Sequence, residues 1–503
     1  MNFRLNKYII LLLATLFLSC SSSKTDKVSF IILQLNDVYE IAPMNRGTEA
    51  GLARVATLRK KLLAENKNTI TVMAGDFLSP SLIGTMKVDG QRVSGEHMVE
   101  TLNAMKLDYA TFGNHEFDLK EKDLLKRLNE STFKWTSANS FHQTDAGIYS
   151  FNQSKKPIPT HIIHEFKSEA GTIFNLGIVS VTLPFNKTDF VSYDDPLAAF
   201  KNTYESIKNS CDAVIGLTHL SLKDDITLAK ENPDLLMVLG GHEHANSSNL
   251  IGNVTINKAD ANAKTVYVHR ISIDLSNGQR TINSELVAIN DKIEEDITVK
   301  QVVDKWQSIS DENLDKLGYN PNEVVYKTTE ALDVLESSIR NGSTNFTKLV
   351  MEAYKFGYPN ADVFFCNSGS IRLDDKLQGS IFQKDILKAF PYGGSLTVAD
   401  INGKMLLEIL MTSVGKNKNT GGFLQMAGVA FDDGIWKINS ESIDLNKVYK
   451  VLIPSFVAAG NEQNLDFIKN APINKPESLG PNKVKNDVRD LVIDYLKSIS
   501  ANQ

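Results

Sequence analysis

The chain has 503 residues, more than a single hydrophobic core usually serves, so its length predicts two domains. Hydrophobic residues make up 42% of the sequence, which fits a globular protein. The 54 basic and 60 acidic residues are mixed along the chain and give a net charge of −6. Because the sequence has no basic block that would neutralise a phosphate backbone, a nucleic-acid polymer is not an expected partner.

The first 20 residues have the pattern of a secretory signal peptide. Arg4 and Lys7 precede an apolar stretch from Tyr8 to Leu18 that is too short to span a bilayer as a mature helix. Cys20 follows this stretch and a serine, and it resembles the acylated cysteine of bacterial lipoproteins. We expect an exported protein that is lipid-anchored through Cys20 to a bacterial membrane and faces the periplasm or the cell surface. Phe17, where a lipobox usually has leucine, leaves open a soluble exported form.

Several short apolar runs end in polar turns that often contain glycine, and then pass into helical patterns. These runs are residues 28–35, 69–74, 109–112, 213–218 and 235–239. Buried strands that alternate with amphipathic helices predict an α/β domain, in which catalytic groups lie at the carboxyl ends of the strands.

Each of these strand ends carries side chains that bind metal ions well. They are Asp37, Asp76, Asn114 with His115, His219, and the pair His242 and His244. Each motif alone has a structural explanation, such as an N-cap for an aspartate, but five in this order favour a metal site. Carboxylate, amide and imidazole ligands suit Zn, Mn or Fe. Two divalent ions bridged by one carboxylate would clamp the oxygens of a phosphoryl transfer and turn water into hydroxide near neutral pH.

The domain boundary is predicted after Ile289. A charged helical pattern from Ile293 to about Leu317 is closed by Gly318, which marks residues 291–321 as a helical linker. The metal-binding domain then covers residues 28–290, and a second α/β region covers residues 322–503.

The motifs LNDVYE, AGDF, GNHEFD, LTHL and GGHEH resemble those of the calcineurin-like metallophosphoesterases, specifically the 5′-nucleotidase and UDP-sugar hydrolase family. The resemblance implies a four-layer α/β/β/α sandwich followed by a second, smaller α/β substrate-binding domain. It also implies that Asp76 bridges two divalent ions and that Asp37 and His244 bind the first ion. The ligands of the second ion would be Asn114, His219 and His242.

His115 and Tyr39 are two further positions of interest. By the same resemblance, His115 paired with Asp118 would stabilise charge on the substrate phosphate. The family has Asp-x-His in its first motif, whereas this chain has Asp37, Val38 and Tyr39. The phenol could bind as phenolate, could turn away and leave water around a weakly held first ion, or could leave the first site empty. We expect it to turn away, because a phenolate ligand needs a strongly acidic metal.

The resemblance continues through the C-terminal region. The segments NSGSIR (367–372), FPYGGSL (390–396) and GGFLQ (421–425) are similar to segments of the family. A glycine-containing turn after a strand at 362–366 lets backbone approach a ligand, and Arg372 can bind a phosphate bidentately. The family positions imply substrate-binding roles for Asn367 and Arg372.

Two aromatic residues would hold the nucleobase. In the family a pair of aromatics sandwiches the base, and the matching positions are Phe423 and Phe456. The family has Gly-Gly-Asp-Gly after the second aromatic, whereas this chain has Gly-Asn-Glu-Gln, in which Glu462 could accept hydrogen bonds from ribose hydroxyls. Arg340 corresponds to a further arginine of the family.

These observations predict a 5′-nucleotidase-type phosphomonoesterase whose partners are a nucleotide substrate and the membrane. A UDP-sugar or cyclic-nucleotide phosphohydrolase of the same family is an alternative. A nucleotide-binding surface protein with a degenerate metal site is another, favoured by Tyr39. If metals and substrate recognition lie on different domains, the domains must close over the substrate, with the helix after Ile293 as the candidate hinge.

Overall fold

The computed structural model describes residues 26–185, 188–475, 478–479 and 484–501. The predicted signal peptide and its Cys20 lie outside the described residues. Among the helices that are described, none combines the length and the apolar character that crossing a lipid bilayer requires.

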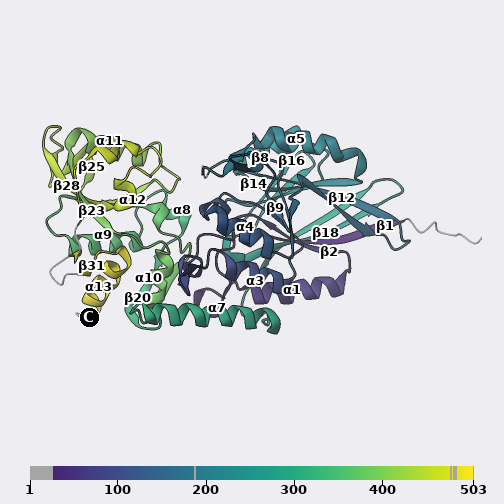
Figure 1. The fold of residues 1–503 in the computed structure, drawn as a ribbon, viewed down its shortest axis with the longest axis horizontal. Coiled ribbons are helices and arrows are strands. Elements are labelled where there is room, and N and C mark those ends of the chain that lie inside the picture. The colour runs from purple at the N-terminus through teal and green to yellow at the C-terminus, as the bar shows by residue number, and fades with distance from the viewer. Residues whose placement is uncertain (1–25, 186–187, 476–477, 480–483, 502–503) are drawn as a thin grey trace, which may run out of the picture.

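Two six-stranded sheets form the centre of the first domain (Figure 1). The order β19-β18-β1-β2-β5-β6 is built from β1 (Lys27–Leu35), β2 (Thr69–Ala74), β5 (Tyr109–Thr111), β6 (Lys134–Thr136), β18 (Thr265–Asp274) and β19 (Arg280–Ala288). The order β11-β12-β14-β15-β17-β16 is built from β11 (His161–Lys167), β12 (Ile173–Thr182), β14 (Ala213–His219), β15 (Met237–Gly240), β16 (Ser247–Ile251) and β17 (Val254–Lys258). Four neighbouring strands of each sheet are parallel, so their carboxyl ends meet at one edge.

The two sheets face each other and helices cover their outer sides. Phe30 of β1 and Phe174 of β12 belong to the core between the sheets. The first sheet is covered by α1 (Leu52–Glu65), α3 (Glu96–Met105), α4 (Glu121–Glu130) and α7 (Ile297–Lys316), and the second by α5 (Pro196–Ile207) and α6 (Leu222–Glu231). Because both faces of each sheet are covered, the central strands are buried along their length, as in β2, where every residue is buried. The four-layer sandwich is confirmed.

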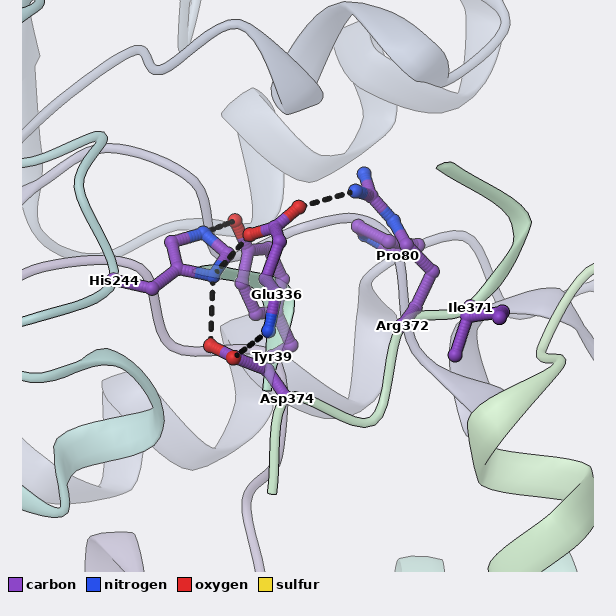
Figure 2. Close-up of a pocket in the computed structure, with 7 residues that line it drawn as sticks. All are labelled: Tyr39, Pro80, His244, Glu336, Ile371, Arg372 and Asp374. Carbon is purple, nitrogen blue, oxygen red and sulfur yellow. Dashed lines mark hydrogen bonds and ion pairs between the residues drawn. The ribbon is translucent and has the colours of Figure 1, made fainter. Parts of the chain in front are cut away.

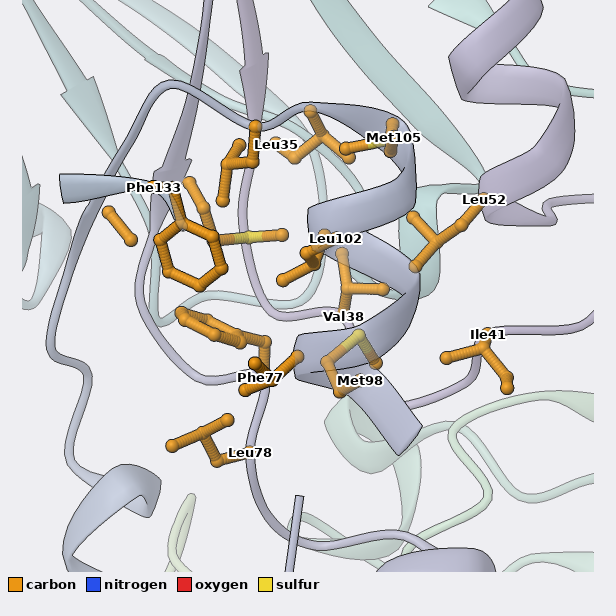
Figure 3. Close-up of a cluster of buried hydrophobic side chains, with 14 of the residues drawn as sticks. Leu35, Val38, Ile41, Leu52, Phe77, Leu78, Met98, Leu102, Met105 and Phe133 are labelled. Atoms are coloured by element: carbon orange, nitrogen blue, oxygen red, sulfur yellow. The ribbon is translucent and has the colours of Figure 1, made fainter. Parts of the chain in front are cut away.

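The core beneath α3 lies directly under the loops that carry the candidate ligands. Figure 3 shows Met98 and Leu102 of α3 near Val38 and Phe77. Val38 follows Asp37 and Phe77 follows Asp76, and both apolar side chains are almost completely buried. Packing of these neighbours therefore fixes where the two loops leave their strands.

The second domain is a smaller α/β layer structure, shown in green and yellow in Figure 1. Its sheet has the order β24-β21-β28-β23-β29, built from β21 (Val363–Asn367), β23 (Leu396–Asn402), β24 (Leu424–Ala427), β28 (Val448–Pro454) and β29 (Ile473–Asn474). One face packs against α9 (Asn345–Gly357), α10 (Gln383–Ala389) and α13 (Val488–Ser500). The other face packs against α11 (Gly403–Val414), α12 (Ser455–Ala458) and the small sheet of β25 (Ala430–Asp432), β26 (Ile435–Ile438) and β27 (Glu441–Ser442). The pair β20 (Val324–Asp333) and β22 (Lys376–Phe382) stands beside this sheet.

Helix α7 connects the two domains and belongs to both cores. The side chain of Asp296 begins it by accepting hydrogen bonds from the backbone N–H groups of Thr298 and Val299. Trp306 packs in the core of the first domain, whereas Leu314 packs in the core of the second. The predicted linker therefore contains a helix that is packed along most of its length.

Candidate metal centre and substrate site

The candidate metal ligands of the first domain lie where β1, β2, β5, β14 and β15 end. Asp37, Asp76 and His242 have φ angles of 54°, 56° and 85°. This left-handed backbone is unusual for residues other than glycine, and such strain concentrates at functional sites. The strained conformation turns the side chains of the three residues toward one place.

Glycines beside the ligands allow this close approach. A Cβ atom on Gly113 would lie 2.1 Å from Asp76 Oδ1, and one on Gly241 would lie 2.4 Å from the carbonyl oxygen of Ala74. No side chain fits at either position, so the loops before Asn114 and His242 meet the end of β2 through bare backbone.

Asp76 lies at the centre of the group. Its Oδ1 accepts a hydrogen bond of 2.7 Å from the backbone N–H of His115. Its Oδ2 lies 3.2 Å from His219 Nε2 and 3.2 Å from the hydroxyl of Tyr39. Burial would raise the pKa of Asp76, but His219 and His115 hold it well below its usual range. Asp76 is therefore ionised, and both of its carboxylate oxygens are able to accept a metal ion.

Two buried oxygen atoms fit a cation. Asp37 Oδ2 accepts hydrogen bonds from Asn36 Nδ2 and the backbone N–H of His242, at 2.8 and 2.9 Å. Asp37 Oδ1 and Asn114 Oδ1 have no hydrogen-bond donor among the residues that the structure describes. Buried polar atoms of this kind are rare unless an ion or water binds them, so the donor set fits a divalent ion.

The imidazoles of His219 and His242 belong to the same set of candidate metal ligands as Asp76 and Asn114. His219 Nδ1 lies 2.7 Å from the carbonyl oxygen of Ala74, so its N–H points there and Nε2 faces Asp76. Burial lowers the pKa of His219, but Asp76 and Asp37 outweigh it and raise that pKa to about 9. Burial and the adjacent His219 lower the pKa of His242 well below its usual value, so His242 is neutral and keeps a lone pair for a metal.

Tyr39 does not turn away from the site, so this expectation is wrong. Its hydroxyl lies 3.2 Å from Asp76 Oδ2 and 3.2 Å from His244 Nε2. The backbone N–H of Tyr39 donates to Asn262 Oδ1 at 2.9 Å, which fixes the loop so that the ring points inward. Burial, with Asp76 and Asp37 close by, raises the pKa of Tyr39 well above its ordinary value. Without a bound ion the phenol is therefore a neutral donor.

Glu116 supports the loops that carry Asp76 and Asn114, and its role was not predicted from the sequence. Glu116 is fully buried, and its carboxylate accepts hydrogen bonds from the backbone N–H groups of Asp76, Phe77, Leu78 and Gly113. Burial and Asp76 raise the pKa of Glu116 to about 6. Its position between His115 and Asp118, in a motif already singled out, was the available signal.

Lys258 ties together the two loops that carry the imidazoles. Its ammonium group donates to the carbonyl oxygens of Leu220 and Gly241, at 2.7 and 2.8 Å, and is completely buried. Asp225 Oδ2, at 2.8 Å, and Glu243 balance its charge. No sequence motif marks this lysine, because its partners come from three separate segments.

Arg372 of the second domain reaches into the first. Its Nη2 lies 2.7 Å from His115 Nε2, and His115 Nδ1 lies 2.6 Å from Asp118 Oδ2. Because arginine can only donate, Nε2 accepts and the proton of His115 is on Nδ1, directed at Asp118. The predicted pairing of His115 with Asp118 is present in this geometry.

Arg340 lies in the same region as Arg372. Glu336 contacts both guanidinium groups, and its Oε1 lies 3.2 Å from Arg372 Nη1. Burial and the nearby Arg372 lower the pKa of Arg340 to about 9. Two guanidinium groups that repel each other form a place where an anion would be stabilised.

The other predicted substrate residues lie on loops at the end of the second sheet. Asn367 Nδ2 donates to Glu462 Oε2 at 2.8 Å, so these two side chains are brought together. The side chain of Phe456 is exposed, with 52% of its surface accessible, whereas Phe423 is buried at 8%. The backbone N–H of Ser368 donates to the carbonyl oxygen of Phe423, which joins the NSGSIR turn to the GGF turn.

A small cavity marks the contact between the domains (Figure 2). It is lined by Tyr39, Pro80, His244, Glu336, Ile371, Arg372 and Asp374. Its volume of about 10 Å³ leaves room for roughly one water molecule. Figure 2 shows the ring of His244 at the left, with Glu336 and Asp374 facing it.

Comparisons with known proteins agree with this arrangement. Residues 30–246 match the calcineurin-like phosphoesterase family, and residues 324–469 match the 5′-nucleotidase C-terminal domain. The chain is 26% identical over 466 residues to the trifunctional nucleotide phosphoesterase YfkN of Bacillus subtilis; the match covers 82% of this chain but only 31% of that protein. It is 23% identical to the 5′-nucleotidase of Bos taurus, over 82% of this chain and 78% of the relative. A 5′-nucleotidase precursor from Thermus thermophilus has the same fold, with a TM-score of 0.75 and 20% identity over 94% of this chain and 97% of that one.

The fold and these matches define a metallophosphatase, a hydrolase of phosphate esters that depends on divalent metal ions. More particularly, the chain combines an N-terminal calcineurin-like phosphoesterase domain with a separate 5′-nucleotidase C-terminal domain.

Proposed function

We propose that the chain hydrolyses nucleoside 5′-monophosphates with two divalent ions. Asp76 would be shared by the two ions, Asp37 and His244 would hold the first, and Asn114, His219 and His242 would hold the second. The contact of Arg372 with His115 carries this proposal, because it brings a phosphate-binding side chain of one domain beside the metal ligands of the other.

The ions, when bound, would polarise the phosphoryl group and lower the pKa of water enough to supply the nucleophile. The protein itself supplies orientation. Asp118 fixes the tautomer of His115, which keeps an imidazole beside the place where the phosphate oxygens develop charge. Arg372 and Arg340 bind the phosphate, and Glu336 must give up its contacts with them when the substrate arrives.

The nucleoside lies on the second domain in this proposal. Phe456 and Phe423 hold the base, and Asn367 and Glu462 face the ribose hydroxyls. Burial raises the pKa of Glu462, although Gln463 and Asn367 donate hydrogen bonds that oppose the shift. In this proposal the second domain binds both the nucleoside and the phosphate, and the first domain supplies the metal ligands.

The narrow contact between the domains bears on substrate entry. A cavity of about 10 Å³ cannot hold a nucleotide, since sites for molecules of that size occupy roughly 300 to 1,000 Å³. The domains must therefore separate to admit the substrate. They must then approach again, because the metal ligands lie on one domain and the substrate-binding residues on the other.

Phosphate release from a panel of substrates tests the proposal. The panel contains AMP, a UDP-sugar, a cyclic nucleotide and an aryl phosphate, each with and without a chelator. Asp76→Asn should lower the rate at least about 100-fold, because it weakens both ions at once. Asp145→Asn, an exposed position in another loop, is the matched control. Full activity of Asp76→Asn or of chelated protein would contradict the mechanism, and cleavage of the UDP-sugar alone would change the substrate.

We also propose that Cys20 carries a lipid anchor and that the enzyme works outside the cytoplasm. The apolar stretch and the cysteine in the first 20 residues support this location. Cys20→Ser should release the protein from the membrane fraction; unchanged membrane association would contradict the anchor.

A further inference from the structure

His244 differs from the other imidazoles in where its support comes from. His219 directs its Nδ1 at a carbonyl oxygen of its own domain. The contacts of His244 Nδ1 are with the second domain: Glu336 Oε2 at 2.6 Å and Asp374 Oδ2 at 2.8 Å. Among the described residues, no first-domain acceptor is recorded for this nitrogen.

The opposite nitrogen of His244 faces the first domain. Nε2 lies 3.2 Å from the hydroxyl of Tyr39 and 3.7 Å from Asp37 Oδ1. When Nδ1 donates its proton to a carboxylate, Nε2 keeps the lone pair that a metal ion needs. The second domain therefore selects the tautomer that makes His244 a ligand.

The two carboxylates are themselves held in place. Asp374 has a φ of 49°, and its Oδ1 accepts a hydrogen bond of 2.8 Å from the backbone N–H of Glu336. Lys264 of the first domain donates to the carbonyl oxygen of Asp374 at 2.7 Å. The side chains of Glu336 and Asp374 are 11% exposed and that of His244 is 15% exposed, so water competes little for these contacts.

We infer that Glu336 and Asp374 are positioning residues for His244, so that the first metal site is complete only while the second domain is docked. This inference rests on the proposed metal centre. It makes the substrate-binding domain a determinant of metal retention, in addition to its part in recognising the nucleotide. The hydrogen-bond partners of metal-bound histidines typically change metal affinity by roughly 10- to 100-fold.

Metal affinity, measured without substrate, tests the inference. The full-length protein is dialysed against buffered Zn²⁺, and Mn²⁺ in a second series, and bound metal per chain is counted. Glu336→Ala with Asp374→Ala should bind one of the two ions roughly 10- to 100-fold more weakly and leave the other unchanged. Glu336→Gln with Asp374→Asn keeps neutral acceptors and should recover part of the affinity. Asp375→Asn is the matched control, since Asp375 contacts Lys264 at 3.5 Å in the same interface.

A second measurement separates positioning from loss of structure. Nitrogen-15 NMR of labelled histidines should show His244 protonated at Nδ1 in the wild type and a mixture of tautomers in the double alanine variant.

Equal affinity in all variants would overturn the inference, and so would a wild type that binds no ion. Three ions in the wild type and two in the double variant would also overturn it, because the cluster would then be a metal site of its own. A protein that binds both ions and loses one as expected, yet releases no phosphate from nucleotides, would contradict only the proposed function.

Discussion

Tyr39 places a phenol among the residues proposed to bind the first ion. Its hydroxyl is 3.2 Å from both Asp76 Oδ2 and His244 Nε2. Two ligands that are each about 2.1 Å from one ion lie roughly 3.0 to 3.4 Å apart, so the hydroxyl stands where a ligand would stand. A neutral phenol is a weak metal ligand, so in the proposed two-ion centre we expect the first ion to be the more easily lost.

Substitution of Tyr39 should therefore change the first ion alone. Tyr39→His should bind it more tightly and lower the metal concentration needed for full rate, because a neutral imidazole offers a lone pair at pH 7. Tyr39→Phe should bind it less tightly. Metal per chain after dialysis and the visible absorption spectrum check both variants. Equal stoichiometry in all three proteins would show that Tyr39 is not a ligand, and a band lost on mutation would identify a phenolate.

The central strands whose carboxyl ends carry the candidate ligands could be predicted well from the sequence. The run 69–74 is β2 itself, and the runs 28–35, 109–112, 213–218 and 235–239 overlap β1, β5, β14 and β15 with ends shifted by one or two residues. The candidate ligands could be predicted because each follows such a run directly. Glu336, Asp374 and Lys258 could not be, because their partners are distant in sequence and come together only in the tertiary structure. The direction of the Tyr39 side chain depends on Asn262, which is equally remote.

The loops after β14 and β15 should depend on Lys258. Lys258→Met removes the ammonium group and leaves Asp225 buried without its partner, which should destabilise the protein by about 3 to 5 kcal/mol. Adding Asp225→Asn removes the uncompensated charge and should recover much of that stability. The two loops would still lack the hydrogen bonds that Lys258 donates to Leu220 and Gly241, so metal retention should stay low. Thermal unfolding and bound metal are measured together; if stability and metal recover in parallel, Lys258 has only a structural role.

At the scale of the whole molecule, the proposed function assigns the chemistry to the first domain and nucleotide recognition to the second. Phe456→Ala should raise KM for nucleotides roughly 5- to 150-fold, the equivalent of 1 to 3 kcal/mol of lost base stacking. An aryl phosphate should be hydrolysed nearly as before. Phe456 is the better probe because it is 52% exposed, whereas truncating the buried Phe423 would also open a cavity. Phe431→Ala, at a residue 60% exposed on β25, is the control. Equal losses on both substrates would argue that Phe456 is structural.

Helix α7 has a consequence for how the halves of such a chain can be exchanged during evolution. Val299, Val303 and Trp306 fill the first core, and each buried side chain contributes roughly 1.5 to 3 kcal/mol. A recombination junction right after the last strand, β19, would discard all three and leave an apolar face of the first domain open to water. A junction at Gly318, where the backbone turns with a φ of 89°, gives up mainly the contacts of Leu314. The unit of the first domain that recombination can transfer intact therefore includes helix α7.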